Sequence, residues 1–214
     1  MNEAQARHWL EDELSVSRET MSRLDEFVAF LSEENARQNL VATRSLPDIW
    51  SRHIVDSAQL LLVAPRLFRS WIDLGTGAGF PGLVIGLLHD GPVTLVEERT
   101  KRIDFLLRAA RLLGIAHRID LVGRRVEALP ARQFDVISAR AFAPLARLLA
   151  LGERFASPAT RWVLPKGQNA KSELEAVRAS WQGEFRLVPS VTDADAQIIV
   201  AEQVRRRGQG KQKQ

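Results

Sequence analysis

The chain has 214 residues, of which 45% are hydrophobic and 26% are charged, the composition of a soluble domain with a full core. It contains no cysteine, which excludes disulfide bonds, thiolate catalysis and cysteine-ligated zinc. The net charge is +4, but residues 1–70 carry 8 basic against 11 acidic side chains, and residues 71–214 carry 22 against 15.

Arginine supplies 25 of the 30 basic residues. Its guanidinium suits bidentate phosphate contacts and stacking on bases, so a polyanionic partner is one interpretation. A genomic base composition that favours arginine codons is the other. Since no leader-like segment opens the chain and no apolar run approaches the roughly 18 residues of a membrane span, we expect a cytoplasmic protein without membrane contact.

Two helices are expected in the first part of the chain. Ser17 or Ser15 can cap the first, whose apolar residues recur at helical spacing as far as Leu31. The second begins near Pro47 and ends at Pro65.

His53 and Asp56 lie three residues apart, and therefore on one face of the second helix. They can form a wall over a substrate pocket, in which case His53 contacts the substrate. Alternatively, they are a hydrogen-bonded pair that ties this helix to the sheet.

From residue 71 onward, strand patterns alternate with helical patterns, which predicts a doubly wound, mostly parallel sheet. The connection between the last two strands is too short for a crossover helix, so we expect an antiparallel C-terminal hairpin and seven strands in all. The expected strands are residues 71–74, 93–96, 119–122, 134–138, 161–164, 185–188 and 198–204. The expected helices are residues 83–89, 102–113, 144–155 and 171–181.

These patterns divide the chain into three parts. Residues 1–68 form an N-terminal helical segment that packs on the core, and residues 69–204 form the ligand-binding α/β core. Residues 205–214 have five basic and no acidic or apolar side chains, which predicts a disordered tail.

A glycine-rich loop follows the first strand and carries most of the functional signal. It reads Asp-Leu-Gly-Thr-Gly-Ala-Gly-Phe-Pro-Gly over residues 73–82, and an apolar helix pattern follows it. A strand, glycine loop and helix present backbone N–H groups to a nucleotide-like ligand, because glycine allows positive φ and close approach.

Two registers of the loop predict different cofactors. A dinucleotide fingerprint fits only when it begins at Gly77, which leaves Asp73 and Gly75 unexplained. The pattern Asp-x-Gly-x-Gly-x-Gly from Asp73 to Gly79 uses every one of these residues and is typical of S-adenosylmethionine-dependent methyltransferases. We favour that cofactor, with a nicotinamide-dependent dehydrogenase as the alternative.

Glu97 ends the next expected strand, 24 residues after Asp73. A carboxylate at this place can accept hydrogen bonds from both ribose hydroxyls of the cofactor. The alternative is that Glu97 and Glu98 only begin the following helix, where acidic side chains suit the helix dipole.

Several motifs together resemble the RsmG family, also called glucose-inhibited division protein B, over residues 35–204. They are the loop at 73–82, Lys101-Arg102-x-x-Phe105-Leu106, Arg125-Val126-Glu127, Ser138-Ala-Arg140-Ala-Phe142, Leu164-Pro-Lys166-Gly167 and Arg52-His53-Ile54-Val55-Asp56-Ser57. Members are bacterial 16S ribosomal RNA methyltransferases. The resemblance implies a class I methyltransferase (Rossmann-like) fold and methylation of guanine N7 in small-subunit rRNA. The chain departs from the family's usual Asp-Ser after the second strand, where it has Glu97-Glu98.

The resemblance also implies which residues bind the cofactor. These are Gly75, Phe80, Val126, Glu127 and Arg140, with the adjoining Gly77 and Gly79.

Guanine N7 carries a free lone pair at neutral pH, so its methylation requires positioning rather than a general base. Arg140 and Lys166 follow strands at the carboxyl edge of the sheet, where ligands bind. We assign both to catalysis: Arg140 bridges cofactor and guanine, and Lys166 holds a phosphate or the guanine O6 atom, unless it is only a turn residue.

Lys101 and Arg125, with the adjoining Arg102 and Arg124 and the basic tail, are candidates for contacts with the RNA backbone, though a solvated helix face explains Lys101 equally well. The four histidines are scattered, so no metal is expected. We expect a monomer that acts on 16S rRNA or on a small-subunit assembly intermediate. A small-molecule methyltransferase and a non-enzymatic RNA-binding module are the remaining alternatives.

Overall fold

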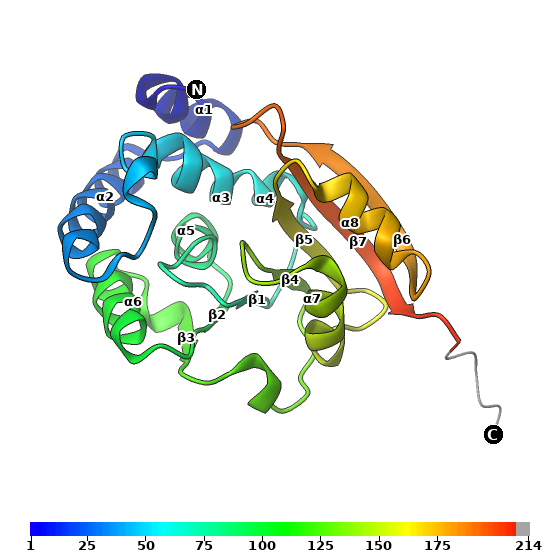
Figure 1. The fold of residues 1–214 in the computed structure, drawn as a ribbon. Helices are drawn as coiled ribbons and strands as arrows, with labels where there is room; N and C mark the ends of the chain where they lie inside the picture. Colours follow the sequence, from blue (N-terminus) through cyan, green and yellow to red (C-terminus); the bar gives the residue numbers. More distant parts are fainter. Residues whose placement is uncertain (209–214) are drawn as a thin grey trace.

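The computed structural model describes residues 1–208, which fold around one seven-stranded sheet (Figure 1). The strands are β1 (Trp71–Leu74), β2 (Val93–Val96), β3 (Ile119–Val122), β4 (Val136–Ser138), β5 (Arg161–Lys166), β6 (Trp181–Pro189) and β7 (Gln197–Arg206). Their order is β3-β2-β1-β4-β5-β7-β6. The first five are parallel, and β7 runs antiparallel to both β5 and β6.

This topology confirms the doubly wound sheet and the C-terminal hairpin. The strand order runs outward from β1 in one direction through β2 and β3, and in the other direction through β4 and β5. A crevice forms beyond the carboxyl ends of strands where the order reverses, so the ends of β1 and β4 are the place to look for a site.

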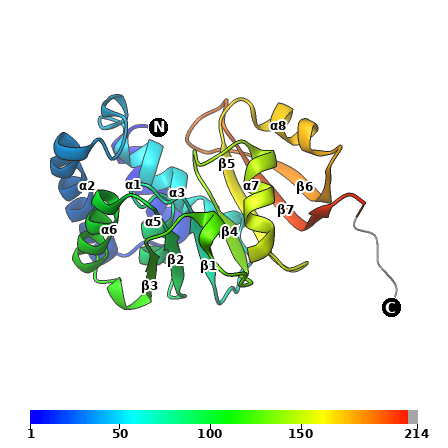
Figure 2. The ribbon, with the colours of Figure 1, turned by 60° about the horizontal axis from the view of Figure 1, so that its bottom comes forward.

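Helices cover both faces of the sheet (Figures 1 and 2). The N-terminal helices pack with α5 and α6 into one hydrophobic cluster, and α7 and α8 pack into a second cluster on the opposite face. The helices are α1 (Glu3–Leu14), α2 (Arg18–Gln38), α3 (Asp56–Ala58), α4 (Leu60–Val63), α5 (Gly82–Leu88), α6 (Thr100–Leu112), α7 (Leu145–Gly152) and α8 (Ala170–Val177). A π-helix, η2 (Trp50–Val55), leads directly into α3.

The predicted helix caps and strands are largely confirmed. Ser17 caps α2 by accepting a hydrogen bond from the Thr20 N–H, and the helical region that starts near Pro47 ends before Pro65. Helix α1 was not predicted. Since Ala6 and Leu10 are its only fully buried residues, its apolar periodicity is weak.

Two boundaries near the C-terminus differ from the prediction. The helix expected over residues 171–181 ends at Val177, and Trp181 begins β6 instead. Trp181 pairs with Arg206 across the hairpin, and the Arg206 guanidinium lies 4.8 Å from the centre of the indole ring. Strand β7 therefore includes the first two residues of the predicted tail, while residues 209–214 lie outside the described part of the chain.

Candidate functional site

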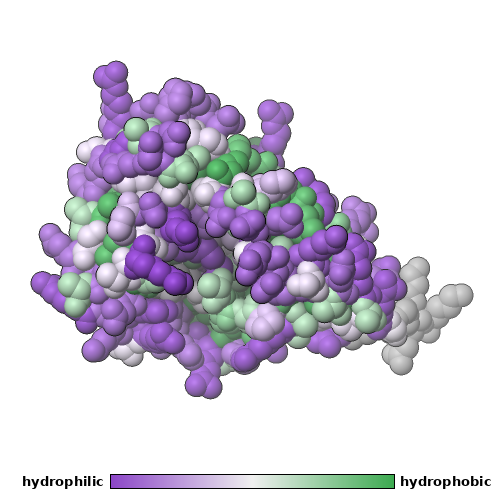
Figure 3. Space-filling model, turned by 45° about the horizontal axis from the view of Figure 1, so that its top comes forward, coloured by the Kyte–Doolittle hydropathy of each residue, from purple (hydrophilic) through white to green (hydrophobic). Residues whose placement is uncertain are grey.

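Two adjoining cavities lie at the carboxyl ends of the strands. The larger, of about 1420 Å³, is lined by the N-terminal segment, the glycine loop, the segment after β4 and the β6–β7 turn. The smaller, of about 400 Å³, is lined by the ends of β2 and β3 and the 3₁₀ helix η4 (Val126–Ala128). Figure 3 shows the hollow with hydrophilic side chains around it. Five residues line both cavities and mark their junction: Gly75, Arg102, Ala141, Phe142 and Ala143.

The glycine loop forms part of the wall with its backbone. Gly75 has φ +68° and Gly77 has φ +61°, and both line the larger cavity. A Cβ atom at Gly75 would overlap the Phe142 ring. Gly79 lines neither cavity, and a Cβ atom at this position would overlap the Leu83 side chain. Gly75 and Gly77 therefore present backbone at the cavity wall, while the missing Cβ atoms of Gly75 and Gly79 allow close packing against Phe142 and Leu83.

Asp73 is fully buried beneath this loop and lines neither cavity. One carboxylate oxygen accepts a hydrogen bond from the Gly82 N–H at 3.0 Å, and the other accepts one from the Ser138 hydroxyl at 2.8 Å. Burial raises the pKa of Asp73, while these hydrogen bonds oppose the rise. Its place assigns it the role of holding the loop rather than of contacting a ligand.

The residues expected to bind a nucleoside meet at the smaller cavity. Glu97, Val126 and Glu127 all line it. The Glu97 carboxylate accepts hydrogen bonds from the N–H groups of Glu98 and Arg99, both at 2.9 Å, which fixes it at the end of β2. The carboxylate therefore shapes the turn between β2 and α6, which begins only at Thr100, and it also lines the smaller cavity.

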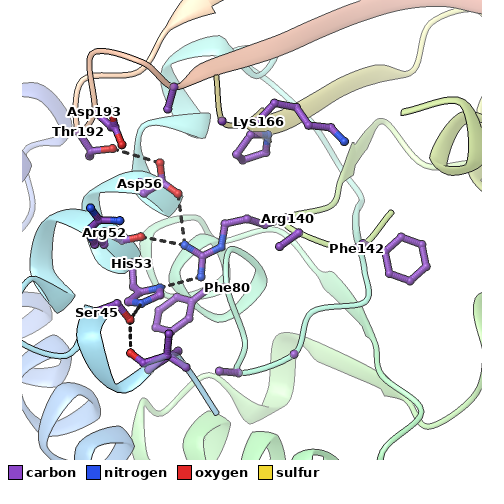
Figure 4. Close-up of a pocket in the computed structure, with 18 of the residues that line it drawn as sticks. Ser45, Arg52, His53, Asp56, Phe80, Arg140, Phe142, Lys166, Thr192 and Asp193 are labelled. Atoms are coloured by element: carbon purple, nitrogen blue, oxygen red, sulfur yellow. Dashed lines mark hydrogen bonds and ion pairs between the residues drawn. The ribbon is translucent and has the colours of Figure 1, made fainter. Parts of the chain in front are cut away.

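Arg140 joins the sheet to the N-terminal helices (Figure 4). Its guanidinium donates hydrogen bonds to the Arg52 carbonyl oxygen at 2.9 Å and to the His53 Nδ1 atom at 2.8 Å, and it lies 3.3 Å from the Asp56 carboxylate. It also lies 5.1 Å from the centre of the Phe80 ring. Arg140 is therefore a tie between segments that both line the larger cavity.

The hydrogen bonds of His53 define its tautomer. Because arginine can only donate, Nδ1 is the acceptor and Nε2 carries the proton, which it donates to the Ser45 hydroxyl at 2.9 Å. The Ser45 hydroxyl in turn donates to the Ala42 carbonyl oxygen at 2.7 Å. Burial, with the positive charges of Arg140 and Arg52, lowers the pKa of His53 to about 3. His53 is thus a neutral wall residue, and it stacks on Phe80.

Asp56 extends the same network to the C-terminal hairpin. It accepts hydrogen bonds from the Gln59 amide at 2.9 Å and from the Thr192 hydroxyl at 3.2 Å. His53 and Asp56 are both bonded to Arg140. The two side chains therefore tie this helix to the sheet through Arg140 rather than through a bond to each other, and both line the larger cavity.

Lys166 also lines the larger cavity, at the end of β5, with its ammonium group already paired. It donates to the Ala143 carbonyl oxygen at 3.0 Å and to the Glu173 carboxylate at 2.9 Å. Glu173 accepts a further hydrogen bond from the Leu145 N–H at the start of α7. Lys166 is thus more than a turn residue, since it helps to fix the segment after β4.

Lys101 and Arg125, two of the candidates for RNA contacts, differ in position. Arg125 lines the smaller cavity and pairs with Glu98 at 2.8 Å, whereas Lys101 is exposed and lines neither cavity. Sequence reasoning named Arg102 only as a candidate for RNA contact and gave Phe142 no role, although both line the two cavities. Phe142 stood within the motif after β4, but nothing in its spacing shows that it lies against Gly75.

Chemically, the smaller cavity combines carboxylates, arginines and a little apolar surface, and the larger cavity has a polar, largely paired wall. Among residues 1–208, no three His, Asp or Glu side chains gather closely enough to hold a metal ion. In the same range, no helix is long and apolar enough to cross a membrane.

Comparisons with known proteins identify relatives along most of the chain. A family model described as rRNA small subunit methyltransferase G matches residues 20–199. A protein of Rhizorhabdus wittichii named ribosomal RNA small subunit methyltransferase G is 56% identical over 212 residues, which cover 98% of this chain and 97% of that protein. The protein of the same name from Zymomonas mobilis is 47% identical and covers 94% of each chain.

Solved structures share the fold at low sequence identity. The cofactor-bound protein Rv0187 from MTB matches with a TM-score of 0.65 and 14% identity over 95% of this chain and 98% of its own. An O-methyltransferase from Bacillus cereus in complex with SAH matches with a TM-score of 0.62 and 14% identity, over 91% of this chain and 96% of its own. These matches confirm the methyltransferase-like architecture.

Proposed function

This chain belongs to the rRNA small subunit methyltransferase G family, and we propose that it transfers a methyl group from S-adenosylmethionine to N7 of a guanine in 16S ribosomal RNA. The observation that carries the proposal is the junction at Gly75, where a nucleoside-sized cavity meets a much larger one. Because the chain belongs to a methyltransferase family, we no longer consider the alternative of a nicotinamide-dependent dehydrogenase.

The residues at the smaller cavity fit an adenosine-containing cofactor. Glu97 presents a fixed carboxylate to a ribose diol, and Val126 offers buried apolar surface to the base. Gly77 leaves room along the loop at the wall of the larger cavity, whereas the space beside Gly75 is filled by the Phe142 ring. S-adenosylmethionine supplies a methyl group activated by a sulfonium, a better electrophile than any that protein side chains provide.

The larger cavity fits an acceptor that needs no deprotonation. His53 is neutral and hydrogen-bonded through both ring nitrogens, and the Lys166 ammonium is paired with Glu173. The N7 atom of guanine has a lone pair in the plane of the ring and requires no base, so these paired groups suffice when they hold the walls in place. We assign Arg140 and Lys166 to this positioning, and we assign Arg125 to the RNA backbone.

The acceptor is naked 16S rRNA or a small-subunit assembly intermediate, and the enzyme acts as a cytoplasmic monomer. The excess of basic over acidic side chains in residues 71–214 supports a polyanionic partner. An ordinary base in folded RNA is stacked, so it must leave the stack to reach the junction.

The test is methyl transfer from labelled S-adenosylmethionine to small-subunit RNA and particles from cells that lack this protein. We expect label at one guanine, which chemical cleavage specific for N7-methylguanine locates. Label on another atom or another base class would contradict the N7 assignment. Absence of transfer to either substrate, by protein that binds the cofactor, would contradict the proposed acceptor.

Gly75→Ala tests the cofactor site. We expect at least about a tenfold loss of S-adenosylmethionine affinity, measured by calorimetry, because the new Cβ overlaps Phe142 at the junction. Gly114→Ala is the matched control, since Gly114 has φ +70° but lies outside both cavities and has room for a Cβ. Equal affinities of the two variants for S-adenosylmethionine would contradict a special role of Gly75 in the cofactor site, because strain at a glycine outside both cavities would then have the same effect.

A further inference from the structure

Phe142 occupies the junction of the two cavities. It lines both, and its ring lies against the backbone of Gly75. Ala141, which precedes it, has φ +51°, a left-handed conformation that is uncommon for alanine and that collects at functional sites. This turn sends the Arg140 and Phe142 side chains in different directions, Arg140 toward His53 and Phe142 away from it (Figure 4).

Among the aromatic side chains that line these cavities, Phe142 alone has a partly exposed ring. Phe80 is 2% exposed, because His53 stacks on it and the Arg140 guanidinium lies near its ring. His53 is 9% exposed and uses both ring nitrogens. The free aromatic surface of the site therefore belongs to Phe142.

We propose that Phe142 stacks on the acceptor guanine after it has left the RNA stack, and that its ring stabilises the positive charge that the guanine gains during methylation. The inference rests on the proposed function. A base that is extruded from RNA loses its stacking neighbours, and an aromatic side chain at the destination replaces them. Such a base must reach the junction to meet a cofactor in the smaller cavity, since residues there line both cavities.

The charge balance of the reaction gives the ring a second role. The N7 lone pair forms the new carbon–nitrogen bond as the carbon–sulfur bond breaks, and the electron pair of that bond goes to sulfur. The positive charge thereby passes from sulfur to the purine ring. The face of a phenyl ring attracts cations, so a stacked Phe142 favours the product side of this transfer.

The competing hypothesis is that Phe142 only shapes the cofactor site through its contact with Gly75. Three variants separate the two roles: Phe142→Leu, which keeps apolar bulk without an aromatic face; Phe142→Tyr, which keeps the face; and Phe185→Leu. Phe185 is partly buried on β6 and lines neither cavity, so it is the matched control.

The measurements are the affinity for unmethylated small-subunit RNA without cofactor, the affinity for S-adenosylmethionine, and the single-turnover methylation rate. We expect Phe142→Leu to weaken RNA binding and to slow the reaction by about tenfold each, with cofactor affinity within about twofold of wild type. Phe142→Tyr should restore RNA affinity and rate, and Phe185→Leu should match wild type.

Unchanged RNA affinity and rate in Phe142→Leu would overturn the inference. A loss confined to cofactor affinity, or a Phe142→Tyr variant as impaired as Phe142→Leu, would overturn it as well. Failure of the wild-type protein to methylate any RNA is a different result, because it contradicts the proposed function itself.

Discussion

At the scale of single residues, the site is built from ionisable groups that hold one another. His53 illustrates the consequence, because its neutral form is built into the wall of the larger cavity. A protonated ring would place a second proton on Nδ1, where the Arg140 guanidinium now donates. Protonation therefore breaks the contact between His53 and Arg140 and brings two positive charges together.

This arrangement predicts a pH dependence of stability. The pKa of His53 is lowered from 6.5 to about 3, so the unfolded chain binds a proton between these values that the folded chain does not. The free energy of unfolding should consequently fall as the pH falls below 6.5, by up to about 1.4 kcal/mol per pH unit from this group. Urea denaturation of wild type and His53→Asn at pH 7.5 and pH 5.5 measures it.

We expect the variant to lose part of the pH dependence of the wild type. The comparison stays above the range in which most carboxylates titrate, so their contribution is similar in both proteins. His8→Asn serves as the control, because the His8 side chain is 74% exposed on α1. An identical pH dependence in wild type and His53→Asn would show that His53 carries no proton linkage.

The sequence placed several residues at the site but could not supply their partners. Glu97 and Val126 were predicted from strand ends and motifs, and both line the smaller cavity. Arg140 and Lys166 were predicted to lie at the carboxyl edge of the sheet, and both do. Their acidic partners come from other elements, and Asp56 precedes Arg140 by 84 residues. A contact between residues so far apart in the sequence cannot be predicted from local periodicity.

At the scale of secondary-structure elements, the network around Arg140 joins three segments: η2 with the start of α3, the end of β4, and the β6–β7 turn. The π-helical turn of η2 brings both the Arg52 carbonyl oxygen and the His53 ring to one guanidinium. Such π segments are often found at functional sites. The wall of the larger cavity therefore depends on contacts between elements.

Arg140→Met should loosen this wall. Asp56 and Arg140 are both less than one-fifth exposed, and removal of one member of a buried pair leaves the other charge uncompensated. We expect a loss of about 3 kcal/mol in the free energy of unfolding. Faster amide hydrogen exchange in η2 and α3 should accompany it.

A double-mutant cycle with Asp56→Asn checks that assignment. If the two side chains act together, the double variant loses less stability than the sum of the single variants. Arg66→Met is the control, because Arg66 is exposed and lines neither cavity. Additive losses, or exchange that stays slow in η2, would show that Arg140 does not tie the segments together.

The elements themselves were predictable to different degrees. The central strands are short, apolar and bounded by turns, so their positions could be derived from the sequence. The prediction placed Trp181 at the end of the helix expected over residues 171–181. Pairing with Arg206 across the hairpin places it in β6 instead, an example of long-range contacts that override a local pattern.

At the scale of the whole molecule, basic side chains surround the smaller cavity. Arg99 and Arg124 line it, are exposed, and have no ion-pair partner within residues 1–208. Arg125 and Arg147 line it as well, each beside one glutamate. Arg69 is also exposed but precedes β1, at the opposite edge of the sheet. A polyanion that enters the site therefore meets positive charge on one edge of the molecule.

This distribution predicts how RNA binding depends on salt. Each phosphate that a basic side chain neutralises releases bound counterions, which adds about 0.7 to the slope of log affinity against log salt for single-stranded RNA.

The double variant Arg99→Gln/Arg124→Gln should weaken binding at low salt and reduce this slope by about one to two units. Arg69→Gln should leave the slope unchanged. Filter binding between about 50 and about 300 mM salt measures all three proteins. A slope near zero in the wild type would favour a small neutral acceptor over RNA, because such a substrate releases no counterions. A normal slope that neither arginine affects would instead place the RNA path on another face of the molecule.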